Sequence, residues 1–449
     1  MFGFVAFAHL ARIFGPDLYG DIEFAIALTL FFNLLVEGGL GLLGAREIAK
    51  NQQVATQMAF HIVLMRCLLA VFSFMGLLAF AYLSNKSALE RQIVVLYGLT
   101  LFGSAGLLHW VFQGLDKMKW VAIGTVMRWS AFAAGVIFFI QDPRLVWLVP
   151  LVEAGAILLV VCFHFSVFCR LFGRLKRTFD FQFARNLFLQ ALPIGLTQMM
   201  WGMKIYLPTI MLGLLVGGEE VGWFGASNRI VVALHTFAWM YFFNLYPSFS
   251  RCAKESFESL NSLTGKSLEI TSWSAIFIGA FGTVAAEPLI KVIYGPQYDE
   301  AVTVFRVLVW LLTFALISGH YMYILIAYNK QWLELMSATI GAAASIILNL
   351  VLITRFGLIG AAWAVLCAEA LVWGLNFLFV RRWITPVPFL KHLIKPLVAG
   401  SIMVGALQFM PISNLWVLCG VGVVLYALMI LILQPRMITD VRSVMFGNQ

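Results

Sequence analysis

Six charged residues lie inside long apolar segments of this 449-residue chain. If these segments cross a membrane, each charge costs about 2.5–3.5 kcal/mol and normally faces a polar cavity or a partner. Four of the six are cations and two are carboxylates, which leaves two positive charges unpaired by count. This surplus favours phosphate and sugar ligands over a cationic drug, because guanidinium groups donate paired hydrogen bonds to phosphate oxygens. The six residues are Arg66, Arg128, Lys204, Arg229, Glu153 and Glu369.

Each of these residues also has a structural interpretation. The three arginines lie close enough to segment ends for their side chains to extend to the membrane interface. We favour this role and substrate binding equally. Lys204 lies near the middle of a segment that contains two prolines, which loosen a helix. For Lys204 we favour cavity lining over a structural ion pair. The two carboxylates are candidates for ion coupling, although a buried, protonated or paired structural role is slightly favoured.

Motifs for catalysis or metal binding are not evident in the sequence. The histidines have no ligand spacing, and the six cysteines are scattered, so we interpret the cysteines as small buried apolar residues. No phosphate-binding loop ending in Gly-Lys-Ser/Thr appears, so ATP hydrolysis is not expected. The acidic pairs Glu219-Glu220 and Asp299-Glu300 could resemble a glycosyl-transferase site, but solvated loops are much better favoured. We predict no enzyme activity, no catalytic residue, no metal and no cofactor.

Membrane helices are the elements that must position these charges. Hydrophobic residues make up 62% of the chain and charged residues 11%, whereas soluble domains carry about 25% charged residues. The first apolar segment, residues 1–14, does not look like a cleavable signal. At about 1.5 Å per residue it would reach roughly 21 Å across a hydrocarbon core of about 30 Å. We therefore expect the natural chain to begin upstream of Met1.

Apolar segments separated by short charged connectors predict an all-α polytopic membrane protein with about 14 transmembrane helices. The segment 92–113 is the weakest of them, because it contains two glycines, a serine and a histidine. The predicted segments are 1–14, 22–43, 58–83, 92–113, 119–140, 145–169, 187–216, 222–248, 268–292, 303–327, 332–353, 359–380, 394–410 and 415–434.

The connectors predict the orientation of the chain. With the N-terminus in the cytoplasm, 19 of the 30 Lys and Arg residues lie in cytoplasmic connectors or the C-terminal tail, and 5 lie in outer connectors. Because positive charge is retained on the cytoplasmic side, both termini are predicted to be cytoplasmic. The net charge of +9 is explained by contact with anionic lipid and implies no nucleic acid partner.

The sequence also repeats itself at an offset of about six segments. Gly20 and Arg46 are separated by 26 residues, as are Gly225 and Arg251. The stretch Gly-Leu-Asp-Lys at 114–117 corresponds to Ala-Tyr-Asn-Lys at 327–330. Two parallel repeats are typical of transporters that hold substrate between their halves. We predict a six-helix lobe at 1–170, a basic cytoplasmic linker at 171–186, a second six-helix lobe at 187–382 and an appended two-helix hairpin at 394–434.

Several short motifs, in order along the chain, resemble the polysaccharide-biosynthesis flippases of the multidrug/oligosaccharidyl-lipid/polysaccharide exporter superfamily. The family normally has a longer first helix with a cytoplasmic lead-in, which this chain lacks. The resemblance covers nearly the whole chain. It is carried by LARIFGPDLYG at 10–20, EGGLG at 37–41, REIA at 46–49, IYGPQY at 293–298, Asn349, and RFGLIGAA at 355–362.

The resemblance implies a function. Members move an undecaprenyl-diphosphate-linked oligosaccharide from the cytoplasmic to the outer leaflet of the bacterial plasma membrane, for O-antigen, capsule or exopolysaccharide assembly. Two lobes are expected to alternate the exposure of a central cavity, and some relatives are coupled to an ion gradient. Implied partners are the lipid-linked substrate, membrane lipids, a polysaccharide polymerase and assembly proteins. Arg12 and Arg46 lie in the family-like motifs, near helix ends. For each of them, we favour contact with the substrate equally with binding a lipid headgroup or capping a helix.

Two alternatives remain at this point. A multidrug exporter of the same superfamily should have more carboxylates than cations within its spans. A polysaccharide polymerase or glycosyl-transferase should carry a large outer loop with paired acids or arginines, whereas the outer connectors reach only about a dozen residues. We therefore favour the flippase.

Overall fold

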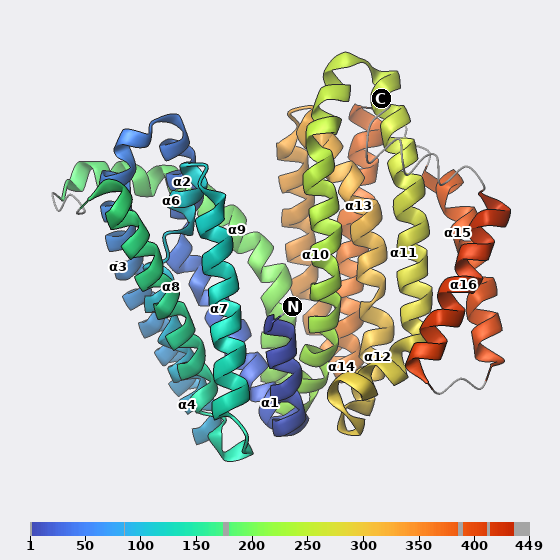
Figure 1. The fold of residues 1–449 in the computed structure, drawn as a ribbon, viewed down its shortest axis with the longest axis horizontal. Coiled ribbons are helices and arrows are strands. Elements are labelled where there is room, and N and C mark those ends of the chain that lie inside the picture. Colours follow the sequence, from blue (N-terminus) through green and yellow to red (C-terminus); the bar gives the residue numbers. More distant parts are fainter. Residues whose placement is uncertain (1, 85, 174–178, 385–388, 411–413, 435–449) are drawn as a thin grey trace. The chain divides into compact units, whose positions relative to one another are not determined.

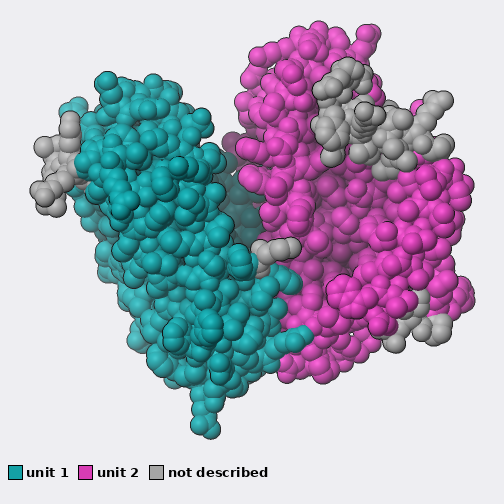
Figure 2. Space-filling model, in the orientation of Figure 1, with its two compact units in different colours: residues 1–222 teal, residues 223–449 magenta. Residues whose placement is uncertain are grey.

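The computed structural model in Figure 1 describes residues 2–84, 86–173, 179–384, 389–410 and 414–434. Within these ranges every regular element is a helix and no strand occurs, which confirms the all-α prediction. The chain forms two compact units, Met1–Gly222 and Trp223–Gln449, coloured separately in Figure 2. We describe each unit by itself.

Unit 1 is built around its first helix. α1 packs against α3, α4, α7 and α9, while α7 packs on α8 and α2 packs on α6. A buried cluster that includes Leu43, Ile62, Trp110 and Phe168 fills the space among α2, α3, α6 and α8. The helices are α1 (Phe2–Glu37), α2 (Leu40–Lys50), α3 (Ala55–Leu83), α4 (Ala88–Gly98), α5 (Thr100–Ala105), α6 (His109–Gly114), α7 (Met118–Phe139), α8 (Leu148–Phe172) and α9 (Phe181–Leu215), with short 3-10 turns at Gln52–Val54 and Pro143–Leu145.

Unit 2 is organised around α11, which packs against α12, α13, α15 and α16. Its two main apolar clusters surround Tyr321 and Trp273, and the Tyr426 hydroxyl donates a 2.9 Å hydrogen bond to the Trp273 carbonyl, linking α16 to α11. Its helices are α10 (Gly218–Glu255, beginning in unit 1), α11 (Phe257–Tyr294), α12 (Asp299–Leu308), α13 (Trp310–Ala327), α14 (Gln331–Trp383), α15 (Phe389–Gln408) and α16 (Leu415–Leu433), with a 3-10 turn at Pro296–Tyr298.

Ten helical segments of the described chain are long and apolar enough to cross a membrane. Two of them, α1 and α14, each join two helices across a non-helical residue. α9 and α15 coincide with two further predicted segments but are not among the ten. Each predicted apolar segment therefore overlaps at least one helix. The number of membrane crossings stays a prediction. The predicted division into lobes at 1–170 and 187–382 also stays a prediction, although α9 packs on α1 within unit 1.

Glycines in the family-like motifs explain the two kinks. Gly15 has φ 69° and precedes Pro16 in α1, and Gly357 has φ 56° in α14. Residues with a Cβ rarely adopt these positive φ values, so glycine is the residue that allows the chain to change direction there. The kinks fall between predicted segments 1–14 and 22–43, and between 332–353 and 359–380.

The weakest predicted segment, 92–113, is three short helices rather than one. α4 ends before Leu99, and α5 ends at Ala105 ahead of a break at 106–108. Segment 303–327 is likewise broken, at Val309 between α12 and α13. The predicted 22–43 segment is interrupted as well, because α1 ends at Glu37 and α2 begins at Leu40.

The repeated motif folds in the same way in both units. Asp116 and Asn329, 213 positions apart, are the two non-glycine residues with positive φ in the described chain, each at 57°. In each copy the next lysine donates its backbone N–H to the carbonyl five residues earlier, at 2.8 Å: Lys117 to Phe112 and Lys330 to Leu325. This bond is typical of a left-handed helix C-cap, which Asp and Asn tolerate better than most residues.

Two minor expectations are wrong. Glu219-Glu220 and Asp299-Glu300, predicted as loops, lie in the first turns of α10 and α12, where acidic side chains complement the helix dipole. The six cysteines, predicted as buried, are all intermediate or exposed. Free thiols on an apolar surface are compatible with lipid contact.

Candidate functional site

The EGGLG motif at 37–41 builds a buried ion pair. Glu37, the last residue of α1, accepts a hydrogen bond and ion pair from Arg66 Nη2 in α3. The Arg66 side chain is 0% exposed and that of Glu37 is 24% exposed. A Cβ on Gly41 would lie 2.5 Å from Arg66 Nη2, so glycine at this position makes room for the guanidinium.

The two central glycines of the motif make the turn between α1 and α2. Gly38 and Gly39 have φ values of 49° and 74°. A Cβ on Gly39 would lie 2.5 Å from the Ala191 carbonyl oxygen and the Gly195 nitrogen of α9. Glycine therefore serves both the left-handed backbone and the close approach of α9 to this turn.

A second ion pair joins α7 to α8. Arg128 Nη2 lies 3.0 Å from Glu153 Oε1, and the side chains are 28% and 14% exposed. The guanidinium also lies over the Trp129 ring, 5.2 Å from its centroid. Because both charges are largely removed from water, each depends on the other for stabilisation. Loss of either partner would leave an unpaired charge in a partly buried position.

The broken segment α4–α6 brings polar groups near these pairs. His109, the first residue of α6, lies within the electrostatic influence of both Arg66 and Arg128. In α5, Ser104 Oγ donates a 2.5 Å hydrogen bond to Asn33 Oδ1 of α1. Interrupted helices at membrane depth are tolerated where they are buried in protein or line a polar cavity. The candidate site therefore consists of the two ion pairs of unit 1, Glu37–Arg66 and Arg128–Glu153, together with His109, and we call this set the polar cluster of unit 1.

The other predicted residues lie outside this cluster. Lys204 in α9 is half-buried, with Nζ 5.0 Å from the centroid of the Trp201 ring. Arg229 in α10 and Glu369 in α14 are half-buried in unit 2, and Arg12 in α1 is exposed. Their roles in binding and coupling stay predictions.

Arg46 lies at the exposed end of α2, with its side chain 55% exposed and 3.0 Å from Glu47 Oε1. Lys50 lies 2.9 Å from the same oxygen. Hydrogen bonds from Lys50 and Arg46 lower the pKa of the Glu47 carboxyl, so it stays ionised in this basic surface. The position is suited to a first electrostatic contact with an anionic group.

Two of the three predicted intramembrane cations in unit 1 have a carboxylate partner, which reduces the predicted surplus of unpaired positive charge. Arg66 and Arg128 each have a carboxylate partner, so the described cluster carries as many anions as cations. The sequence count overlooked Glu37, although it lies within the predicted 22–43 segment. Its place as the first residue of the EGGLG motif was the signal in the sequence that could have identified it as a site residue. With Glu37 included, four cations stand against three carboxylates, so the charge count argues less strongly against a cationic substrate.

Sequence reasoning also missed a second polar cluster in unit 1. Lys86 donates 2.8 Å hydrogen bonds to Glu90 Oε1 and to the Gly213 carbonyl. Asp21 of α1 is 9% exposed and lies within hydrogen-bonding reach of Glu90. The sequence Ser-x-x-Glu at 87–90 forms a capping box on α4. This pattern could have predicted the helix start that positions Glu90 in the cluster.

Exchange of charges tests whether the Arg128–Glu153 pair is structural. Arg128→Met should lower the free energy of unfolding by about 1–3 kcal/mol, less than for a fully buried pair because both side chains are partly exposed. R128E/E153R should recover at least half of that loss, since the opposite charges remain adjacent. Titration with sodium dodecyl sulfate in mixed micelles measures the difference. No recovery in the exchanged variant would contradict a simple ion pair.

Comparison with known proteins adds to this geometry. The profile of the family described as "Polysaccharide biosynthesis protein" matches residues 1–253. A protein of Escherichia coli (strain K12) named "Putative O-antigen transporter" is 25% identical over 389 residues, covering 84% of this chain and 92% of that protein. Among solved structures, "Lipid II flippase MurJ, inward closed conformation" has a TM-score of 0.81 at 14% identity, with 97% of both chains covered. An inward-facing multidrug resistance MATE family transporter has a TM-score of 0.69 at 12% identity, covering 85% of this chain and 93% of that one. At these identities the two structures show a shared fold alone.

Proposed function

Because the chain belongs to the polysaccharide biosynthesis protein family, we propose that it flips an undecaprenyl-diphosphate-linked oligosaccharide across the bacterial plasma membrane. It is a multi-pass membrane transporter rather than an enzyme. The observation that carries the proposal is the similarity to the O-antigen transporter of E. coli along almost that protein's whole length. The flipped unit would then enter O-antigen, capsule or exopolysaccharide assembly, with a polymerase and assembly proteins as partners.

The proposed mechanism is alternating access between two six-helix lobes, with both termini in the cytoplasm. Arg46 is exposed at the end of α2, on the predicted cytoplasmic side, and would make an early contact with the diphosphate. The predicted substrate-binding residues would contact the lipid-linked substrate as it crosses the membrane, and Lys204 would line the cavity. The complete predicted set is Arg12, Arg46, Arg66, Arg128, Lys204 and Arg229.

Ion coupling would depend on carboxylates that change partner during the cycle. Glu153 and Glu369 are the predicted candidates. Glu153 accepts from Arg128, so protonation of Glu153 would release the guanidinium for another ligand. The same logic applies to Glu37 and Arg66, because the Glu37 side chain is the more exposed member of that pair.

A clean deletion in the source bacterium tests the function. The strain should lose surface polysaccharide and accumulate the lipid-linked unit in the inner leaflet, and a plasmid copy should restore both. Electrophoresis of surface polysaccharide and lipid extraction measure the two effects. Normal polysaccharide in a strain without a second flippase gene would refute the proposal.

Multidrug export is the second candidate, favoured by the shared fold with a multidrug transporter and by the balanced charges of unit 1. The same deletion strain separates the two functions. Drug susceptibility that rises while surface polysaccharide stays normal would favour export. Loss of polysaccharide with unchanged susceptibility would favour the flippase.

A further inference from the structure

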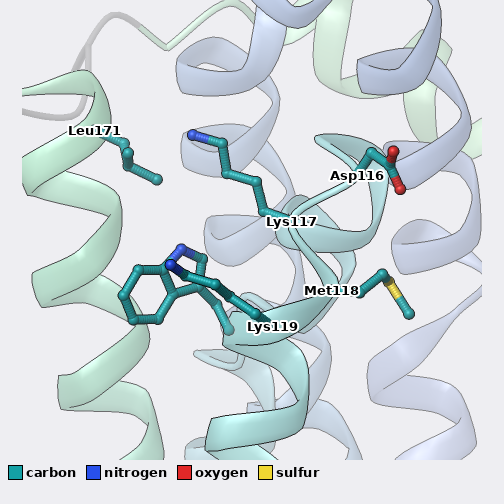
Figure 3. Close-up of a pocket in the computed structure, with 6 residues that line it drawn as sticks. Asp116, Lys117, Met118, Lys119 and Leu171 are labelled. Atoms are coloured by element: carbon teal, nitrogen blue, oxygen red, sulfur yellow. The ribbon is translucent and has the colours of Figure 1, made fainter.

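A pocket of about 380 Å³ opens in unit 1 between the start of α7 and the end of α8. Its volume is within the usual range for small-ligand sites. Figure 3 shows the Lys117 side chain extending across the gap towards Leu171, while the Asp116 carboxylate points away on the other side of the turn. The lining residues are Asp116, Lys117, Met118, Lys119, Trp120 and Leu171.

Two lysines line the pocket, and the carboxylate of Asp116, the one acidic residue among the described lining residues, points away from it in Figure 3. Lys117 is half-buried, and among the described residues its side chain makes no hydrogen bond or ion pair. Lys119 is exposed, with Nζ 4.7 Å from the centroid of the Trp120 ring. An anionic ligand would stabilise a half-buried ammonium group that has no anionic partner in the protein.

The repeated motif in unit 2 provides an internal comparison. Lys330, the counterpart of Lys117, donates a 3.1 Å hydrogen bond to the Trp383 carbonyl at the end of α14. Its ammonium also lies over the Trp383 ring, 5.0 Å from the centroid. The same turn therefore gives its lysine a partner within the protein in unit 2, whereas in unit 1 the lysine faces the pocket.

The position of the pocket indicates what occupies it. α7 begins at Met118 and α8 ends at Phe172, and both helices are long and apolar enough to cross a membrane, so the pocket lies where hydrocarbon gives way to headgroups. Trp120 is of the residue type enriched at that level. Met118 and Leu171, 54% and 40% exposed, provide apolar surface for acyl chains beside the two ammonium groups.

We propose that this pocket binds the phosphate of an anionic glycerophospholipid, with Lys117 and Lys119 as its cationic ligands and Trp120 beside the glycerol. The lipid would be a resident of the leaflet, not cargo. Direct charge-assisted hydrogen bonds from the two lysines to the phosphate, at about 1 kcal/mol net each, correspond to about 30-fold in affinity.

Native mass spectrometry of the purified full chain tests the proposal with phosphatidylglycerol and, for comparison, phosphatidylethanolamine. We expect the wild type to prefer phosphatidylglycerol and K117Q/K119Q to bind it about 30-fold more weakly. K117R/K119R, which keeps both charges, should stay within about threefold of the wild type, because charge dominates this attraction. The matched control R381Q/R382Q removes two exposed cations from the end of α14 and should not change binding.

Three outcomes would overturn the assignment. Equal losses in K117Q/K119Q and R381Q/R382Q would mean that the basic surface attracts lipid without a site. Displacement of phosphatidylglycerol by inorganic phosphate at equal concentration would assign the pocket to free phosphate. Displacement by undecaprenyl diphosphate, in the wild type but not in K117Q/K119Q, would make the pocket part of the substrate path. Thermal unfolding of each variant shows that the protein used is folded.

Discussion

Replacing Arg66 with methionine is expected to lower the free energy of unfolding by about 2–4 kcal/mol, because it leaves the Glu37 carboxylate, which is 24% exposed, beside an apolar side chain without its cation. The Arg66 side chain is 0% exposed and forms its ion pair with Glu37. Glu37→Gln should be similarly costly, since it leaves the guanidinium in the interior without a counter-charge. Titration of the purified protein with sodium dodecyl sulfate measures both losses.

The double variant E37L/R66M separates packing from binding at this pair. Removal of both charges should recover most of the stability, because replacing a buried ion pair with apolar side chains is often neutral. If Arg66 also contacts the substrate, this folded variant should still fail to restore surface polysaccharide in the deletion strain. Full complementation by E37L/R66M would remove Arg66 from the proposed substrate-binding residues. Arg144→Met, at an exposed position of the 3-10 turn Pro143–Leu145 and outside the proposed substrate-binding set, is the control for loss of a cation.

Replacing Gly39 with alanine is expected to cost about 2–5 kcal/mol, from left-handed backbone strain and overpacking together. Gly39 has φ 74°, and its Cβ would meet the backbone of α9 at 2.5 Å. Backbone atoms in a helix cannot move aside as a flexible side chain can. We therefore expect poor accumulation of folded G39A in the membrane and little complementation of surface polysaccharide.

Gly173→Ala is the matched control for Gly39→Ala. Gly173 has the same φ of 74°, but its Cβ would have no neighbour within 4 Å among the described residues. With ψ at −150°, in a region that essentially only glycine adopts, G173A should show a backbone cost without overpacking, about 1–3 kcal/mol. Equal losses in the two variants would contradict the importance of the contact between α2 and α9.

Most of the helical architecture was predictable from sequence alone. Hydrocarbon admits only segments whose backbone hydrogen bonds are internally satisfied, so long apolar segments had to be helices. The repeat was also readable, because both copies place Asp or Asn, which tolerate left-handed backbone, directly before a lysine. The breaks at Leu99 and Val309 were not predictable, since apolar residues occur on both sides of each break.

The sequence by itself determined the class of protein, the apolar segments and the charged residues within them, because hydropathy and residue type are local properties. Only the tertiary structure decided which charges meet. Glu37 and Arg66 are 29 positions apart, and Arg128 and Glu153 are 25 apart, on different helices in each case. Pairing of this kind depends on helix rotation and on close approach at glycines such as Gly41, which no periodicity specifies. The predicted cationic surplus is smaller in unit 1 for that reason, because Arg66 pairs with Glu37, which the count left out. Charges can be summed along a sequence, whereas neutralisation requires contact in space.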